Sequence, residues 1–412
     1  MTRKQAFAVL FSAIMVLSMV ASGGAGLAGA TSEDVEHEFD DVSETIELSE
    51  QPAEVESEVL EEAEDDTTEA VVRLSEIDQA SLATGDRDLV VDQLKSYADA
   101  SQEPVIEYAE DAGVEVKNTL WITNAILVEA NEEQLEELSA IDRVERIHAN
   151  HEYEIPDVEM SDADIDPDND YTYGVEQINA PDVWDDFDTK GEGASVAVLD
   201  GGYDNDHQDL PEIHPDDQWQ EWDGDGNPVE SDPRSTSGVD HGVHVSGTIV
   251  GADDPEGDVP GFGVAPEATL YNGLVLPGGT GSFTQVAAGM EWSIDVWGVD
   301  IINMSLGGGP STTDLIPAAE HIWQAGSILV ASNGNNQIGA PGTYWSSFGS
   351  QAVDENENPA SFADEEFIDD PDAFFGTDVP DHWPDEYQTP HASAAGVDVL
   401  SAQEGDGYTE LS

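Results

Sequence analysis

Two residues, Asp200 and His241, have the types and surroundings of a carboxylate–imidazole pair. Asp200 follows the apolar run 195–199 and precedes two glycines, so a buried strand and a tight turn would hold its carboxylate rigidly. His241 opens the sequence His-Gly-Val-His-Val-Ser-Gly-Thr. A hydroxyl nucleophile needs an imidazole as base and a buried carboxylate that orients this base. The pair therefore points to acyl transfer at a hydroxyl.

Each of these residues also has a plainer interpretation. Asp200 alone is typical of a turn before glycines, and His241 with His244 could instead bind a metal ion. The metal interpretation lacks a suitably spaced glutamate and any cysteine, because the chain has 0 Cys. Asp240 and Ser237 are alternative caps for a helix that begins at His241.

Two further motifs follow predicted strands. Asn335 lies in Ser-Asn-Gly-Asn-Asn, where a side-chain amide can donate a hydrogen bond to a developing oxyanion. Asn-Gly is equally typical of a plain turn. The run Met-Ser-Leu-Gly-Gly at 304–308 has small residues with free backbone groups, which suits an extended peptide added as a strand, or a simple glycine loop.

The elements that must position these residues are short apolar strands alternating with helices. Strands are predicted at 195–199, 268–276, 299–304 and 327–331, and helices at 284–297 and 312–326. This alternation predicts an α/β fold with a doubly wound, mostly parallel sheet. Sites in such sheets form at the carboxyl ends of strands, which is where Asp200 and Asn335 are expected.

A smaller α+β module is predicted for residues 70–151, ahead of this α/β domain at 171–412. Its segments follow the order strand, helix, strand, strand, helix, strand, which is typical of a ferredoxin-like module. The segments are 71–74, 89–109, 114–116, 120–128, 132–138 and 144–147. Residues 31–69 have the composition of an acidic disordered spacer, and residues 152–170 that of an irregular linker and processing region.

The first 30 residues have the pattern of an export signal. Arg3 and Lys4 precede the apolar stretch 6–21, and Ala28-Gly-Ala offers small residues for cleavage. A membrane-spanning helix needs about 20 apolar residues, and this stretch is shorter. The sequence therefore predicts a secreted protein without a stable membrane anchor.

The charge balance is extreme, with 91 Asp plus Glu against 10 Lys plus Arg and a formal net charge of −81. So few cations cannot build a basic patch, which argues against nucleic acid as a partner. Self-repulsion of this size opposes compaction at low salt, whereas at about 1 M salt the Debye length falls to roughly 3 Å. The composition predicts a protein that works in concentrated brine.

Taken together, the motifs resemble the subtilisin-like serine proteases (subtilases), most closely the halolysin type of halophilic archaea. The order of Asp200, His241 and Asn335 with Ser-Leu-Gly-Gly between the last two carries the resemblance. Further matching stretches are Tyr-Gly-Val-Glu-Gln-Ile at 173–178, Asp-His-Gln-Asp-Leu at 206–210, Gly-Val-Ala-Pro at 263–266 and Ile-Ile-Asn-Met at 301–304. The resemblance covers about residues 171–363. Gly201 and Val243 depart from it, since Ser or Thr is usual at the first position and Thr at the second.

The resemblance implies roles for particular residues. Asp200 would orient the imidazole, His241 would be the general base, and Asn335 would donate to the oxyanion. The primary substrate pocket would be lined by Ser305, Leu306, Gly307, Ser332, Asn333 and Gly334. The module at 70–151 would be a propeptide that assists folding, inhibits the enzyme and is then removed.

Calcium is the expected cofactor. By the resemblance Asp209 corresponds to a calcium ligand of the family. The stretch Asp-Gly-Asp-Gly-Asn at 223–227 also places oxygen donors at alternate positions, as calcium loops do, but the closing glutamate is missing.

The nucleophile of the family lies in Gly-Thr-Ser-Met-Ala-x-Pro-His, and no Gly-Thr-Ser follows Asn335. One alignment matches Thr389-Pro-His to the end of this motif, which puts Glu386 in the place of the serine. The other, which we favour because it aligns many more residues, matches 393–401 and 408–412 to the segment before the motif, with the serine expected just beyond Ser412.

The expected function is that of a secreted serine endopeptidase acting on proteins or peptides, with its own propeptide as a further partner. We expect the chain as given to be inactive, because it lacks the serine. The alternatives are a non-catalytic, peptide-binding remnant and a gene product that never folds stably.

Overall fold

The computed structural model describes residues 46–412, apart from 50, 64–65, 83–85, 239 and 378. The predicted export signal at 1–30 lies outside the described residues, as does the spacer up to residue 45. All described residues belong to one packed unit of the chain, Phe39–Ser412. Among them, no helix combines the length and the apolar character needed to cross a membrane.

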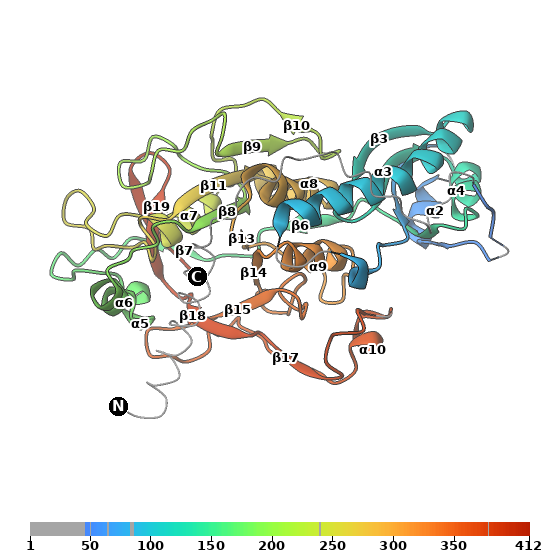
Figure 1. The fold of residues 1–412 in the computed structure, drawn as a ribbon. Coiled ribbons are helices and arrows are strands. Elements are labelled where there is room, and N and C mark those ends of the chain that lie inside the picture. The colour runs from blue at the N-terminus through green and yellow to red at the C-terminus, as the bar shows by residue number, and fades with distance from the viewer. Residues whose placement is uncertain (1–45, 50, 64–65, 83–85, 239, 378) are drawn as a thin grey trace, which may run out of the picture. The chain divides into compact units, whose positions relative to one another are not determined.

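The N-terminal described part folds around a five-stranded sheet with the strand order β1-β5-β2-β4-β3 (Figure 1). Its elements are β1 (Glu54–Val55), α2 (Ser57–Ala63), β2 (Thr68–Leu74), η1 (Gln79–Ser81), α3 (Arg87–Asp111), β3 (Glu115–Leu120), β4 (Ala125–Ala130), α4 (Glu132–Ser139) and β5 (Val144–His148). Neighbouring strands are antiparallel except β1 and β5, which are parallel. From β2 to β5 the long elements follow the order predicted from the sequence.

The strand predicted at 120–128 is in fact divided by a turn at 121–124. Asn124, the last residue of this turn, has a φ of 41°, a left-handed conformation that asparagine tolerates better than most residues. Its side chain accepts hydrogen bonds from Ser101 and Gln102 and donates one to the carbonyl of Ser75. These long-range bonds stabilise a turn that the apolar local sequence does not indicate.

The prediction of a disordered spacer over 31–69 is wrong for its C-terminal half. There β1 pairs with β5, and α2 buries Val59 and Ala63 against the sheet. Val55, Val59 and Ala63 recur every four residues. This spacing places Val59 and Ala63 on one face of α2, and Val55 lies just before the helix. Because acidic residues dominate the composition of this stretch, the composition predicted disorder although a short apolar pattern is present.

The C-terminal part contains an eight-stranded sheet with the order β10-β9-β11-β8-β13-β14-β15-β18. Its elements, in chain order, are α5 (Tyr173–Gln177), α6 (Ala180–Phe187), β8 (Ser195–Asp200), β9 (Trp219–Trp222), β10 (Pro228–Val229), α7 (His241–Val250), β11 (Thr269–Leu274), η2 (Pro277–Gly279), β12 (Thr280–Ser282), α8 (Phe283–Trp292), the π-helical turn η3 (Ser293–Trp297), β13 (Ile301–Met304), α9 (Ile316–Gln324), β14 (Ile328–Ser332), β15 (Phe348–Val353), β16 (Glu366–Ile368), α10 (Pro371–Phe375), β17 (Tyr387–Thr389), β18 (Ala392–Ala395), β19 (Val399–Gln403) and β20 (Gly407–Leu411). All neighbours in the sheet are parallel except β9 and β10. The predicted α/β fold with a mostly parallel sheet is confirmed.

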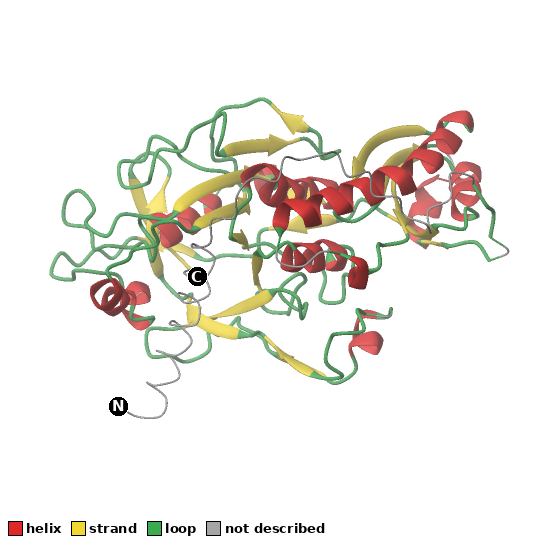
Figure 2. Ribbon diagram, in the orientation of Figure 1, coloured by secondary structure: helices red, strands yellow, loops and turns green. Residues whose placement is uncertain are grey.

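Strand β8 shows why the sheet is covered on both faces. Successive side chains of a strand point to opposite faces. Val196 and Val198 pack in a cluster with Val250 of α7, whereas Ala197 and Leu199 join the cluster that contains α8 and α9. Figure 2 shows these helices among the strands of the sheet. Burial on both faces explains the continuous apolar run that predicted this strand.

Two segments for which no helix or strand was predicted contain ordered elements. Within the predicted linker 152–170, β6 (Glu152–Glu154) pairs with β12, and β7 (Met160–Asp162) pairs with β20. Residues 364–391 carry β16, α10 and β17, and Phe375 and Trp383 of this segment are buried. The partners of β6 and β7 lie more than a hundred residues further along the chain, and β16 and β17 are separated by α10 and its flanking loops. Local periodicity therefore did not indicate these short strands.

Candidate functional site

Asp200 is the last residue of β8, with β11 and β13 on either side of that strand. Its side chain is fully buried. Oδ1 accepts a hydrogen bond of 2.6 Å from the backbone N–H of Gly201, and both carboxylate oxygens lie 2.9 Å from Nδ1 of His241. These hydrogen bonds fix the orientation of the buried carboxylate.

His241 begins α7, and its position is fixed from the backbone side as well. Its N–H donates to Oγ of Ser237 at 2.8 Å. Of the two predicted caps, Ser237 is therefore the one that binds the helix start, while Asp240 accepts from Ser235 instead. A Cβ at Gly242 would collide with the backbone of Gly202 and lie 3.2 Å from Oδ1 of Asp200, so a glycine is needed here for helix and turn to approach.

The hydrogen bond to Asp200 leaves the second ring nitrogen of His241 available. Since Nδ1–H donates to the carboxylate, Nε2 carries the lone pair. Among the described residues, no side chain forms a hydrogen bond with this Nε2. The arrangement can take a proton from a hydroxyl placed there, which is the chemistry of an imidazole base oriented by an acid.

The alternative of a metal site at His241 and His244 does not fit the geometry. His241 is bound to Asp200, and Nε2 of His244 lies 2.8 Å from the carbonyl of Val399. His244 is buried, and this burial lowers its pKa to about 4. It is a neutral histidine in the core that connects α7 to β19.

Asn335 follows β14, as the strand-end argument required, but it does not contact the Asp200–His241 pair. Its Nδ2 donates a 3.0 Å hydrogen bond to the backbone carbonyl of Asp157. The amide is thus directed at a peptide carbonyl of the segment that follows β6. An acyl-transfer site needs a donor aimed at a carbonyl in this way.

The segment from Glu152 to Asp157 lies between β12 and the backbone of Gly307, which forms an isolated bridge in the loop after β13. Glu154 exchanges backbone hydrogen bonds of 3.1 and 3.0 Å with Gly307, and Ile155 donates to the carbonyl of Gly279 at 3.0 Å. On the other edge β6 pairs antiparallel with β12. An extended peptide bound between two strands in this manner is held by its main chain, whatever its sequence. The sequence analysis missed this cleft occupant, and the only local signal was an isolated tyrosine, Tyr153, in an acidic stretch.

Two side chains of this segment explain local sequence features. Tyr153 is fully buried in the same cluster as Phe283 of α8, and a Cβ on Gly308 would lie 3.1 Å from its ring. A Cβ on Gly201 would lie 3.3 Å from Cδ1 of Ile155. The glycine that departs from the usual Ser or Thr after Asp200 therefore leaves space for the bound segment.

The residues expected to line the primary pocket differ in what they expose. Leu306 is fully buried in the core, so only its backbone can face a ligand. Asn333 is also buried, where it donates to the carbonyl of Asp364 and accepts from Thr389. Gly307 contributes its backbone to the bound segment, and Ser305 accepts from the amide of Asn303. Ser332 accepts from the backbone of Gly334.

Asp209, the predicted calcium ligand, is buried and has two hydrogen-bond donors near its carboxylate. Its two oxygens accept hydrogen bonds from the hydroxyl of Tyr408 and from the N–H of Glu256. In the 223–227 stretch, Asp223 accepts from the backbone of Asp225 and Asn227, which closes a turn. Calcium requires several oxygens directed at one point. Calcium binding at Asp209 and at 223–227 stays a prediction from the sequence.

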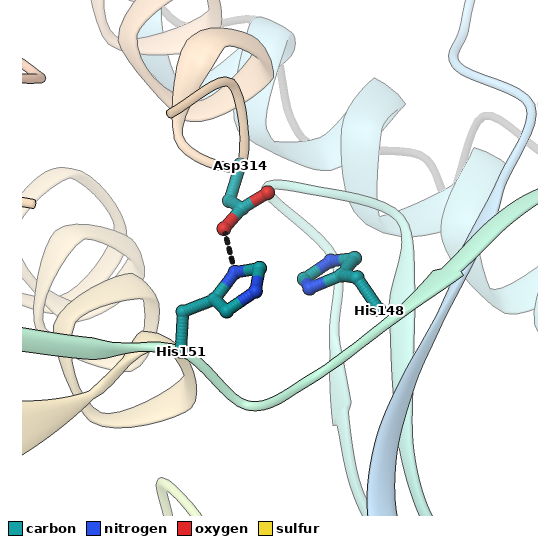
Figure 3. Close-up of side chains that lie close together, drawn as sticks. All are labelled: His148, His151 and Asp314. Carbon is teal, nitrogen blue, oxygen red and sulfur yellow. Dashed lines mark hydrogen bonds and ion pairs between the residues drawn. The ribbon is translucent and has the colours of Figure 1, made fainter. Parts of the chain in front are cut away.

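A second group of titratable side chains, absent from the sequence analysis, consists of His148, His151 and Asp314 (Figure 3). Nδ1 of His151 lies 2.6 Å from Oδ2 of Asp314, and its Nε2 lies 3.1 Å from Glu56. These hydrogen bonds to Asp314 and Glu56 raise the pKa of His151 to about 10, whereas burial lowers the pKa of His148 to about 4. His148 and His151 lie three positions apart, but Asp314 lies 163 residues beyond His151, so no single motif indicated the group.

Comparison with known proteins places this site in context. Residues 191–371 match the subtilase family (Peptidase_S8). Subtilisin DY of Bacillus licheniformis is 35% identical over 182 residues, which are 42% of this chain and 61% of that protein. Subtilisin E of Bacillus subtilis is 30% identical over 283 residues, 66% of each chain, and thermitase of Thermoactinomyces vulgaris is 31% identical over 195 residues, 46% of this chain and 65% of that protein. The chain thus spans just under two thirds of the length of these relatives.

Proposed function

Because this chain belongs to the subtilase family, we propose that it derives from a secreted, halolysin-like serine endopeptidase that cleaves proteins or peptides. The observation that carries this proposal is the bond between Nδ1 of His241 and the buried carboxylate of Asp200. In this geometry Asp200 orients the imidazole, and Nε2 of His241 removes the proton of a serine hydroxyl. One relative, of Bacillus subtilis, bears the name minor extracellular protease Vpr.

In the proposed reaction the substrate lies where residues 152–157 now lie. Its main chain pairs with Gly307 and with the strand edge at Gly279 and β12. Nδ2 of Asn335 then stabilises the oxyanion that forms when the hydroxyl attacks the substrate carbonyl, a contribution of about 3–4 kcal/mol in related chemistry. The side chain enters a pocket formed by 305–307 and 332–334, with Leu306 and Asn333 acting through their backbone.

We further propose that residues 70–151 act as the propeptide and that processing occurs within 152–170. Three observations support this. The bound segment follows β5 directly, it occupies the cleft in an extended conformation, and Asn335 contacts the carbonyl of Asp157. The module blocks the site as long as this segment remains attached.

The 412 residues by themselves are proposed to lack peptidase activity. Among the described residues, no hydroxyl hydrogen-bonds Nε2 of His241, and without a nucleophile only oxyanion stabilisation and binding remain. The test is peptide hydrolysis in molar salt, together with labelling by a serine-directed fluorophosphonate probe. We expect neither turnover nor labelling, and a covalently labelled serine in this chain would overturn the proposal of inactivity.

A second candidate function is that of a non-catalytic peptide binder. The observation that favours it is the backbone pairing of the segment 152–155 with Gly307, Gly279 and β12. Such a binder needs only the two strand edges around Glu154 and no nucleophile. The two candidates differ in the role of Asn335. Its replacement by Leu removes the donor to Asp157, which should leave peptide retention by the strand edges almost unchanged but abolish oxyanion stabilisation wherever the chain is combined with a nucleophile.

A further inference from the structure

The cluster of His148, His151 and Asp314 joins three parts of the chain. His148 ends β5, His151 lies just before β6, and Asp314 lies just before α9. One potential ligand atom from each residue can be chosen such that all three lie within 4.8 Å of one another. Figure 3 shows the ring of His151 directed at Asp314 and the ring of His148 beside that of His151.

His148 has a buried ring nitrogen that is free to bind a metal ion. Its side chain is fully buried, and Nε2 has no hydrogen-bond partner among the described residues. Nδ1 lies 2.7 Å from the carbonyl of Ala149, so Nδ1 carries the proton and Nε2 carries a free lone pair. A buried polar atom without a partner is costly, which calls for a group that satisfies it.

The other two residues are oriented by partners on their far atoms. Nε2 of His151 contacts Glu56, and Oδ1 of Asp314 is bound by Arg146. This leaves Nδ1 of His151 and Oδ2 of Asp314 side by side at 2.6 Å, with one proton between them. Metal-bound histidines almost always donate their other N–H to a carboxylate or a backbone carbonyl, as His151 and His148 do here.

We propose that Nε2 of His148, Nδ1 of His151 and a carboxylate oxygen of Asp314 form a binding site for a divalent transition-metal ion of the zinc class. Two imidazoles and one carboxylate are a donor set that zinc accepts, with a fourth position for water. The ligand atoms lie within 4.8 Å of one another, and side-chain rotations would have to bring each to about 2.0–2.2 Å from a single ion. Asp314 also contacts Arg73 through its backbone carbonyl, so nearby positive charge opposes the ion. The ion displaces the proton shared by His151 and Asp314, so the local charge rises by one unit only.

A metal ion at this place would fasten β5 and the segment before β6 to the start of α9. It would thereby hold the segment 152–157 in the cleft, since that segment follows His151 directly. An ion that binds the folded chain but not the unfolded chain raises the thermal midpoint in proportion to the logarithm of its concentration. Removal of the metal should therefore lower the midpoint.

The experiment uses the full 412-residue chain in molar NaCl, stripped with a chelator and then dialysed against micromolar ZnCl2. A millimolar excess of CaCl2 is present to occupy the many acidic side chains. We expect one zinc ion per chain in the wild type and a loss of at least tenfold in affinity in His148→Phe and Asp314→Asn. His214→Gln is the matched control, because His214 is exposed and distant from the cluster in the sequence, and this variant should bind zinc like the wild type.

His148→Phe retains an aromatic ring against Phe283 and His151, so its fold can be checked by circular dichroism. A second readout does not depend on the variants, because Co2+ bound to the wild type at two imidazoles gives a visible absorption spectrum that ZnCl2 abolishes. Stoichiometric zinc that survives in His148→Phe, a wild type that binds none, or a cobalt spectrum without imidazole ligands would each overturn the proposal.

Discussion

At the scale of the single residue, the Asp200–His241 pair makes a prediction that does not require activity. Asn at position 200 has the same shape as Asp, but its amide can donate a hydrogen bond to Nδ1 of His241. We therefore expect Asp200→Asn to shift the ring from the Nδ1–H form toward the Nε2–H form, which is the wrong tautomer for a base. Nitrogen NMR of the histidine side chains measures this change.

The histidine signals supply their own control. His214 is exposed and pairs with Asp217 rather than Asp200, so its ring nitrogens should keep their chemical shifts in Asp200→Asn. An unchanged tautomer at His241 would mean that the carboxylate does not orient this ring, and the proposed role of Asp200 would fail.

Tyr153 gives a second prediction at this scale. Its ring is fully buried in the cluster that contains Phe283, and its hydroxyl has no hydrogen-bond partner among the described residues. Tyr153→Ala should lower the free energy of unfolding by about 3–5 kcal/mol, the usual cost of truncating a large buried ring. Tyr153→Phe is the matched variant and should be neutral or slightly stabilising, because it removes only an unsatisfied polar atom.

Urea unfolding at fixed molar NaCl would compare these two variants with the wild type. If Phe proved as costly as Ala at position 153, the hydroxyl would have a partner that the described residues do not show. If Ala proved harmless, residues 152–157 would not be anchored in the cleft through this side chain.

At the scale of the element, the sequence predicted the strands that carry the site because burial on both faces leaves a continuous apolar run. Asp200 is the last residue of β8, and Asn335 lies three residues after the end of β14, so both were predicted at strand ends. The sequence did not predict β6, whose partner strand β12 lies far along the chain, or the left-handed turn at Asn124. Nor did it predict the His148 cluster, because Asp314 lies far along the chain from His148 and His151 and no local pattern connects the three.

The contact between α9 and the turn before β4 makes a prediction about pH. His321 of α9 is buried, and its Nδ1 lies 2.7 Å from the carbonyl of Ile122. Burial lowers its pKa to about 4, and the charged groups that face it are Glu320 on its own helix and Arg73 on β2. When the pH falls below about 6.5, the ordinary pKa of histidine, the folded state therefore binds fewer protons than the unfolded state. Stability is full above pH 6.5 and is lost as the pH falls through 4.

His321→Gln isolates this contribution, because Gln can still donate to the carbonyl of Ile122 but does not titrate. A pKa shift of this size corresponds to about 3 kcal/mol between pH 7 and pH 4. We expect the wild type to lose about that much more unfolding free energy than His321→Gln over this range, as followed by thermal unfolding in molar salt. Identical pH profiles for the two proteins would show that His321 is not held neutral by burial.

At the scale of the whole molecule, the charge decides the conditions under which any of these experiments succeeds. Six of the basic residues in the described part already pair with carboxylates, namely Arg73, Lys95, Lys117, Arg146, Lys190 and Arg234. With 91 acidic residues against 10 basic ones, most carboxylates have no cationic partner. Their mutual repulsion opposes folding unless salt screens it.

We therefore expect the thermal midpoint to rise steeply between 0.1 and 3 M NaCl and the chain to unfold at low salt. Sucrose at matched osmolality separates two causes, because it favours compact states through exclusion from the surface but screens no charge. If sucrose restored folding as well as NaCl, reduced hydration would be the dominant effect. If only NaCl restored folding, screening of the net negative charge would be what allows the chain to fold. This is the physical reason for the prediction that the protein works in brine.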